Sequence, residues 1–143
     1  MPRCDVIGVM ERDEVDRWLA GYVEAWRTYD RERIAALFSA DAKYRYHPYD
    51  EWVCGREAIV SSWLGESDAE GASTPDQPGT WEAEYRTIAV DGDAAVAVGS
   101  TMYSVERGGP VDRVYDNCFV LNFDADGRCK EFTEWYVKRP RQA

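Results

Sequence analysis

The residue best suited to acid–base chemistry is His47, the only histidine in the chain. An imidazole changes its charge near neutral pH, so it serves readily as a general acid or base. Pro48 follows directly and holds the backbone of His47 extended, which places the ring reproducibly. Two interpretations stay open at this point: His47 transfers protons, or it is a turn histidine whose hydrogen bonds are satisfied.

A carboxylic acid among aromatic residues is the second candidate for proton transfer. The turn at residues 124–127 pairs the last two predicted strands, and the simplest pairing sets Asn117 opposite Glu134 and Phe119 opposite Phe132 on one face. Burial among aromatic rings would raise the pKa of the Glu134 carboxyl, because burial disfavours the charged form. The alternative is that Glu134 forms an ion pair with an arginine.

Aromatic side chains gather around His47. The stretch 40–63 predicts a strand with Tyr44 and Tyr46 on one face, a corner at His47 and Pro48, and a helix after Gly55. This concentration of aromatic residues is typical of the wall and rim of a pocket.

The sequence lacks the signatures of metal and nucleotide sites. One histidine and four cysteines without a CxxC pair supply no tetrahedral ligand set, so we expect no metal and free thiols. There is no glycine-rich phosphate loop and no G-x-S-x-G elbow, and we expect no cofactor. A net charge of -10, from 27 acidic and 17 basic residues, argues against nucleic acid as a partner.

Length and hydropathy predict one domain, residues 1–143, in the cytoplasm. No apolar run approaches the roughly 20 residues that span a bilayer, so we expect no contact with a membrane. The apolar run at residues 6–10 is too short for a signal peptide.

Hydrophobic periodicity predicts three helices in the first half of the chain. Apolar residues recur at helical spacing over residues 13–29, with Asp13 as a possible N-cap, and over residues 31–38 and 56–65. Residues 66–80 hold turn formers and acids. We expect a loop there, the least ordered internal segment and a gate to a pocket if one exists.

The second half predicts four antiparallel strands in a meander, separated by turn sequences at 91–92, 107–110 and 124–127. Several of these strands are apolar on both faces, so the outer face of the sheet must also be covered. Trp135 and its neighbours would form a contiguous apolar patch there, and we expect a homodimer through the outer face. Alternatively, residues 6–10 fold back over this face and leave a monomer.

Several short motifs, taken in order, resemble the nuclear transport factor 2-like superfamily, particularly its polyketide-cyclase-like (SnoaL-like) and ketosteroid-isomerase-like branches. The matching pieces span nearly the whole chain: YDRERIAALFSADA, HPY followed by GREAI, and YDNCFVLNFDADGR with EWY close behind. The resemblance implies an α+β domain of cone shape, in which three N-terminal helices pack in the concavity of a curved, mostly antiparallel sheet. It also implies a pocket between helices and sheet, usually in a dimer.

Proton transfer in the isomerases of this superfamily uses a tyrosine of the first helix, an aspartate directly before a proline, and a protonated aspartic acid on a late strand. By this resemblance Tyr22 stands at the tyrosine position and His47 at the position of the aspartate base. Phe119 stands where the protonated aspartic acid would be. Half of the oxyanion hole is thereby lost, which argues against steroid isomerisation.

We therefore predict a pocket for a small apolar or aromatic molecule, with proton-transfer chemistry of isomerase, cyclase or dehydratase type. His47 is the predicted base, Tyr22 the hydrogen-bond donor and Glu134 an auxiliary acid. The predicted ligand-binding residues are Trp18, Tyr46, Trp52, Trp63, Asn117, Phe119 and Tyr136. The alternative is a noncatalytic ligand-binding or dimeric interaction module of the same fold.

Overall fold

The computed structural model describes residues 10–66 and 74–141. Its elements, in chain order, are α1 (Arg12–Thr28), α2 (Arg31–Ala36), β1 (Phe38–Arg45), β2 (Val53–Cys54), α3 (Arg56–Trp63), β3 (Trp81–Asp91), β4 (Ala94–Ser104), β5 (Val111–Phe123) and β6 (Cys129–Lys138). The predicted order of three helices followed by a four-stranded meander is confirmed. Within the described ranges, no helix combines the length and the apolar character needed to cross a membrane.

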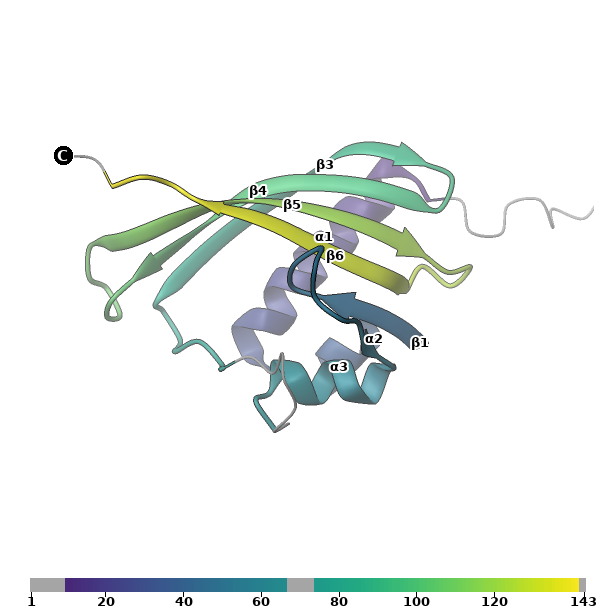
Figure 1. Ribbon diagram of the computed structural model, residues 1–143, viewed down its shortest axis with the longest axis horizontal. Helices are drawn as coiled ribbons and strands as arrows, with labels where there is room; N and C mark the ends of the chain where they lie inside the picture. The colour runs from purple at the N-terminus through teal and green to yellow at the C-terminus, as the bar shows by residue number, and fades with distance from the viewer. Residues whose placement is uncertain (1–9, 67–73, 142–143) are drawn as a thin grey trace, which may run out of the picture.

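One sheet of six strands organises the molecule, in the order β2-β1-β6-β5-β4-β3. Strands β3 to β6 are antiparallel neighbours, whereas β1 joins β6 in parallel and β2 lies antiparallel on the free side of β1. The sheet curves, and the three helices lie on one side of it (Figure 1). This is the predicted α+β architecture, with the helices in the concavity of a mostly antiparallel sheet.

Helix α1 is amphipathic and begins at a capping box. The backbone N–H of Glu11 donates to Oε1 of Glu14 at 3.1 Å, and the side chain of Glu11 accepts from the backbone of Glu14. Glu11 is therefore the N-cap, two residues before the Asp13 that the sequence suggested. The buried face of α1 consists of Val15, Trp18, Leu19, Tyr22 and Ala25.

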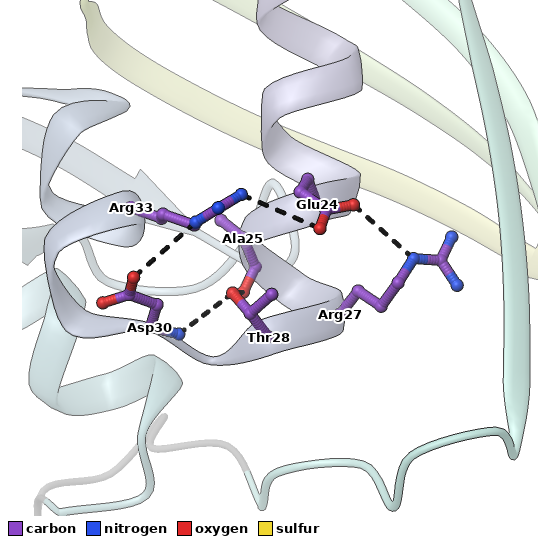
Figure 2. A network of polar contacts seen from close by, with 6 residues as sticks. All are labelled: Glu24, Ala25, Arg27, Thr28, Asp30 and Arg33. Atoms are coloured by element: carbon purple, nitrogen blue, oxygen red, sulfur yellow. Dashed lines mark hydrogen bonds and ion pairs between the residues drawn. The ribbon is translucent and has the colours of Figure 1, made fainter.

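Polar contacts fix the corner between α1 and α2 (Figure 2). The guanidinium group of Arg33 lies 3.7 Å from the carboxylate of Glu24 and 3.6 Å from that of Asp30, so it joins the end of α1 to the start of α2. Tyr29 between the two helices has a left-handed backbone with φ of 50°. Such a conformation is uncommon for a residue other than glycine, and here it turns the chain directly after α1.

Aromatic rings fill the core between α1 and the sheet. Tyr44 stacks on Phe132 with ring centroids 4.4 Å apart, and Tyr22 stacks on the same ring at 5.5 Å. Along the inner face of β5, Phe119 is almost completely buried, as are the two inward residues that follow it. The core therefore occupies the part of the sheet nearest the final hairpin turn.

The register of that hairpin differs from our prediction by two residues. The observed partners are Asn117 with Tyr136 and Phe119 with Glu134, not Asn117 with Glu134 and Phe119 with Phe132. The turn closes between Asp124 and Arg128, where the backbone N–H of Asp124 donates to the carbonyl oxygen of Arg128 at 2.8 Å, and an irregularity next to this turn adds a further residue. A shift of two residues keeps every side chain on its predicted face, because side chains alternate with a period of two.

Two predicted segments fall partly outside the described residues. Of the loop 66–80, residues 67–73 lie outside. The described remainder is held against α1, since the backbone N–H of Asp76 donates to the hydroxyl of Tyr29 at 2.8 Å and Nε1 of Trp26 donates to the Asp76 carboxylate at 3.0 Å. Of residues 6–10, the alternative cover of the sheet, Met10 is the one that is described, and it is buried.

Candidate functional site

A cavity of about 300 Å³ opens between α1, α3 and the inner face of the sheet. Among the described residues its lining has aromatic, polar and charged side chains but no aliphatic ones: Tyr22, Trp26, Tyr29, Tyr44, Tyr46, Trp63, Thr74, Asp76, Tyr85, Thr101, Tyr103, Arg113, Tyr115, Asn117, Glu134 and Tyr136. Eight of the nine tyrosines of the chain are in this set. The volume lies at the lower end of the range for small-molecule sites.

The inward-facing residues of β5 line the cavity at one end of the strand and belong to the core at the other. Arg113, Tyr115 and Asn117 are alternate residues of β5 and line the cavity. The next inward residues of this strand are Phe119 and Leu121, which are buried in the core. The cavity thus begins where hydroxyl, amide and charged side chains replace hydrocarbon ones along the strand.

A chain of hydrogen bonds crosses the sheet and ends at Glu134. The hydroxyl of Tyr85 lies 2.7 Å from Oγ1 of Thr101, Oγ1 of Thr101 donates to Oδ1 of Asn117 at 3.0 Å, and Nδ2 of Asn117 donates to Oε2 of Glu134 at 2.7 Å. A threonine hydroxyl has one proton, which Thr101 gives to Asn117, so Tyr85 is the donor in the first bond. Every donor in this chain therefore points toward the carboxyl group of Glu134.

Burial raises the pKa of Glu134 from 4.5 to about 7, and the hydrogen bond from Asn117 opposes this rise because it stabilises the carboxylate. Among the described residues, Glu134 forms no ion pair with an arginine, the alternative left open by the sequence. A carboxyl group that titrates near neutral pH can both accept and return a proton under physiological conditions.

The tyrosines near Glu134 keep their protons. Burial raises the pKa of Tyr22 and of Tyr44 well above 10, and the nearby carboxyl of Glu134 raises both further. Burial also raises the pKa of Tyr85. These phenols therefore stay neutral. Tyr85 already gives its proton to Thr101, and Tyr22 and Tyr44 share a hydrogen bond with each other, so one hydroxyl proton of that pair remains for a molecule in the cavity.

His47 lies at the rim and reaches the cavity through another residue. Its Nε2 atom is 2.7 Å from the hydroxyl of Tyr136, which lines the cavity, and its Nδ1 atom is 2.9 Å from the carboxylate of Asp50. The imidazole also stacks on the ring of Tyr49, with centroids 4.9 Å apart.

The structure brings together at the cavity six of the ten residues that the sequence suggested for the site: Tyr22, Tyr46, Trp63, Asn117, Glu134 and Tyr136. Trp18 and Phe119 instead lie in the core, where Nε1 of Trp18 donates to the carbonyl oxygen of Leu37 at 2.9 Å. Trp52 lies beside the outer face of the sheet, where the guanidinium group of Arg45 covers its ring at 3.9 Å. His47 forms hydrogen bonds with Asp50 and with Tyr136. Of these two partners, Tyr136 is the one that lines the cavity.

Sequence reasoning missed much of the lining, including Tyr85, Thr101, Tyr103 and Arg113. The signal that could have found them is the row of hydroxyl and charged side chains at inward positions of β3, β4 and β5, where a closed core would have aliphatic residues. Nowhere in residues 10–66 and 74–141 do three or more histidine, cysteine, aspartate or glutamate side chains form a group that could hold a metal ion.

Comparison with known proteins identifies related sequences and folds. The sequence profile of the SnoaL-like domain family matches residues 19–132. The fold is similar to that of a "putative ketosteroid isomerase" from Kribbella flavida DSM 17836, with a TM-score of 0.60 and 17% sequence identity over 92% of this chain and 84% of that one. At this identity the likeness shows a shared fold.

Part of the chain is similar in sequence to part of a longer protein. The chain is 35% identical over 58 residues to the ECF RNA polymerase sigma factor SigG of Mycobacterium tuberculosis, in strains CDC 1551 / Oshkosh and ATCC 25618 / H37Rv. The aligned part is 41% of this chain but 16% of the sigma factor, so the chain corresponds to a small part of that protein's length.

Proposed function

Given that the chain belongs to the SnoaL-like domain family, we propose that its cavity binds a small, flat, oxygen-bearing aromatic molecule and moves a proton at a carbon next to a carbonyl group. Glu134 is the base. The observation that carries this proposal is a carboxyl group with a pKa of about 7 in the wall of a cavity lined by eight tyrosines. The sequence suggested His47 as the base. We assign this role to Glu134 instead, because Glu134 lines the cavity.

The lining supports this class of ligand. Tyrosine rings offer flat apolar faces to a planar molecule, and their hydroxyl groups offer donors to its oxygen atoms. A ligand of hydrocarbon alone would leave these hydroxyl groups without partners, which costs free energy in a partly dry site. The proposed ligand is therefore aromatic and also carries carbonyl or hydroxyl oxygens.

The chemistry follows from the groups around Glu134. Its carboxylate takes a proton from the carbon beside the carbonyl, and negative charge develops on the carbonyl oxygen. Tyr22 and Tyr44 are close enough to Glu134 for its charge to affect their pKa values, and they stay protonated. The hydroxyl proton that their mutual hydrogen bond leaves free can be donated to the enolate oxygen and stabilise its charge. Return of the proton to another carbon completes an isomerisation.

The test uses a simple carbon acid, β-tetralone, a bicyclic aromatic ketone. Its protons next to the carbonyl exchange with heavy water when a base removes them, and proton NMR follows the loss of signal. We expect the protein to accelerate this exchange and the Glu134→Gln variant to lose about 100-fold or more of the acceleration. Gln keeps an oxygen that can accept the hydrogen bond from Asn117, so the fold should persist.

The matched control is Glu131→Gln, a change on the same strand at an exposed position. It should exchange β-tetralone as fast as the unchanged protein. Equal exchange by the Glu134→Gln and Glu131→Gln variants would refute Glu134 as the base.

The second candidate is noncatalytic ligand binding by the same cavity. Its supporting observation is that the hydrogen bonds that run from Tyr85 through Asn117 end on the carboxyl group of Glu134, so these bonds stabilise the proposed base and not an enolate. Under this alternative, β-naphthol would raise the melting temperature of the protein by binding, while exchange of β-tetralone would stay at the rate in buffer.

A further inference from the structure

We infer that the aromatic ketone bound in the cavity is also an acid: it carries a carboxylate group at the end away from the ketone, and Arg113 binds this carboxylate. Among the residues that the structure describes, Arg113 is the one positively charged side chain in the cavity lining. The inference rests on the proposed function, because it takes the aromatic rings to lie in the cavity and the ketone to lie at Glu134. It adds the charge of the ligand and the residue that selects for it.

The neighbours of Arg113 hold its guanidinium group in the cavity wall. Arg113 lies on the inner face of β5, and its guanidinium group covers the ring of Tyr103 with 4.3 Å to the ring centroid. Its Nη1 atom donates to the carboxylate of Asp112 at 3.2 Å. The side chain of Arg113 is 35% exposed, so a bound carboxylate keeps part of its hydration and binding does not require complete desolvation.

Arg113 has hydrogen-bond donors to spare for a ligand. A guanidinium group carries five N–H donors in a planar fork, which matches the two oxygen atoms of a carboxylate. Within the part of the chain that the structure describes, Arg113 forms side-chain hydrogen bonds with Asp112 and Tyr115. These two partners leave donors of the fork without a protein acceptor, and a carboxylate in the cavity can accept from them.

The positive charge of Arg113 is not cancelled inside the cavity. Its ion-pair partner in the described structure is Asp112, which is not a lining residue and is shared with Arg141 at 3.1 Å. Two guanidinium groups and one carboxylate leave one net positive charge. A chain with a net charge of -10 repels anions in general, so a cation in the wall of its cavity is a local feature that favours one anionic group.

The two acids of the lining limit the ligand to one carboxylate. The carboxylate of Asp76 accepts from Nε1 of Trp26 at 3.0 Å and lies 3.4 Å from the hydroxyl of Tyr29. Glu134, whose pKa burial raises to about 7, is only partly charged at neutral pH. A second anionic group on the ligand would be repelled by Asp76, so we expect a monocarboxylic acid.

Arg113 and Glu134 stand at two ends of the cavity. Glu134 is the strand partner of Phe119, which follows Arg113 on β5 by six residues, or roughly 20 Å of strand. Tyr103 lies within electrostatic reach of both ends: burial raises its pKa, the carboxyl of Glu134 raises it further, and Arg113 opposes the rise. A ligand that reaches both groups is therefore elongated, with the ketone at one end and the carboxylate at the other.

The first test measures binding without any reaction. The probes are 2-naphthoate and 2-naphthamide, which have nearly the same shape but differ in charge, and calorimetry gives the dissociation constant of each. We expect Arg113→Gln to weaken binding of 2-naphthoate about tenfold and to leave 2-naphthamide within about twofold of the unchanged protein. Retained binding of 2-naphthamide also shows that the variant keeps its cavity. Arg113→Lys keeps the charge without the planar fork and should lose about threefold for 2-naphthoate.

The matched control is Arg128→Gln, which removes the same charge from an exposed position in the turn after β5. It should leave the affinities of both probes unchanged. Equal weakening of 2-naphthoate by Arg128→Gln and Arg113→Gln would reduce the effect to the net charge of the protein and overturn the inference.

The second test joins the carboxylate to the reacting ketone. It compares the exchange of β-tetralone in heavy water with that of the β-tetralone that carries a carboxylate on its benzene ring, at the position farthest from the ketone. We expect the acid to have a KM about tenfold lower at a similar kcat, because Arg113 binds the carboxylate and does not touch the reacting atoms. Arg113→Gln should remove this difference and leave β-tetralone unaffected.

The outcomes separate the inference from the proposed function. An affinity for 2-naphthoate that Arg113→Gln does not lower overturns the inference, while exchange of β-tetralone that depends on Glu134 leaves the proposed function standing. Binding of 2-naphthoate that depends on Arg113, without exchange of either ketone, overturns the proposed proton transfer and leaves the carboxylate site in place. Absence of binding by both naphthalene probes overturns the two together.

Discussion

Glu134 keeps its proton in the folded protein over a pH range in which the unfolded chain has lost it. Its pKa is about 7 in the fold against 4.5 in the absence of burial. Between these two values the folded state binds more protons than the unfolded state, so the free energy of unfolding falls as the pH rises from about 4.5 to about 7. The size of the pKa rise corresponds to roughly 3 kcal/mol. The candidate base is therefore held at a cost in stability at neutral and alkaline pH.

The Glu134→Gln substitution should remove this cost. We expect the free energy of unfolding of the unchanged protein to fall between about pH 5 and about pH 8 by roughly 2 to 3 kcal/mol more than that of the variant. Urea unfolding at the two pH values measures the difference. The exposed control Glu131→Gln should follow the unchanged protein. Parallel pH dependence of the Glu134→Gln variant and the unchanged protein would show that Glu134 is not buried as the structure describes.

At the level of elements, the close packing of β3 against β4 requires a residue without a side chain at Gly99. A Cβ atom at this position would lie 2.5 Å from Cδ1 of Tyr85 and 2.0 Å from the carbonyl oxygen of Glu84. The first contact shows that the ring of Tyr85 lies over the backbone of β4, where it reaches Thr101. The second involves backbone that cannot move without disturbing the strand pair.

Gly99→Ala should therefore separate Tyr85 from Thr101. We expect a loss of about 1 to 3 kcal/mol in the free energy of unfolding, typical of overpacking, together with slower exchange of β-tetralone. The neighbouring change Ser100→Ala alternates to the other face of β4 and serves as the control, with stability within about 0.5 kcal/mol of the unchanged protein. Unaltered exchange in a folded Gly99→Ala variant would show that the chain from Tyr85 does not tune Glu134.

Local pattern predicted the elements well, but long-range pairing set their ends. The helix predicted over residues 31–38 ends at Ala36, because Phe38 starts β1 and pairs with Cys129 of β6. The helix predicted over residues 56–65 ends at Trp63. A parallel pairing between segments about ninety residues apart leaves no mark in the periodicity of either one, so these ends could not be predicted from a local window.

The sequence predicted which face of its strand or helix each site residue occupies, but not whether the residue lies at the cavity or in the core. Strand alternation placed Asn117, Glu134 and Tyr136 on one face, and a turn longer than expected did not change this because the shift was two residues. Trp18 and Tyr22 share one face of α1, yet Trp18 lies in the core and Tyr22 at the cavity. Where the core ends along a helix depends on how far the sheet curves around it, and a single helical pattern does not contain that information.

For the whole molecule, the outer face of the sheet divides into a covered and an uncovered part. Near β1, Nε of Arg45 donates to Oγ1 of Thr133 at 3.1 Å, and Thr133 is buried. Trp52 stacks on the same guanidinium group. Further along β6, Trp135 is 41% exposed and Val137 is 69% exposed. The chain thus covers the β1 end of its outer face and leaves the other end to solvent or to a partner.

The uncovered part is the surface through which we expect a homodimer. Trp135 is the strand partner of Cys118, and Cys118 is the strand partner of Val98, so three outward residues form one row across β6, β5 and β4. A contiguous apolar row of this kind is unfavourable in water, and two-fold pairing would bury it on both copies. Each chain has a net charge of -10, so the two copies repel, and added salt should strengthen the dimer by screening this repulsion.

Light scattering at micromolar concentration should therefore give the mass of two chains, with a dimer that tightens as the salt concentration rises. The Trp135→Glu variant should have the mass of one chain, because the carboxylate adds repulsion and would be buried without a partner in the interface. Val105→Glu changes an exposed apolar residue after the end of β4 and should leave the dimer intact. A single-chain mass for the unchanged protein would refute the homodimer, and a Trp135→Glu variant that remains dimeric would place the interface on another surface.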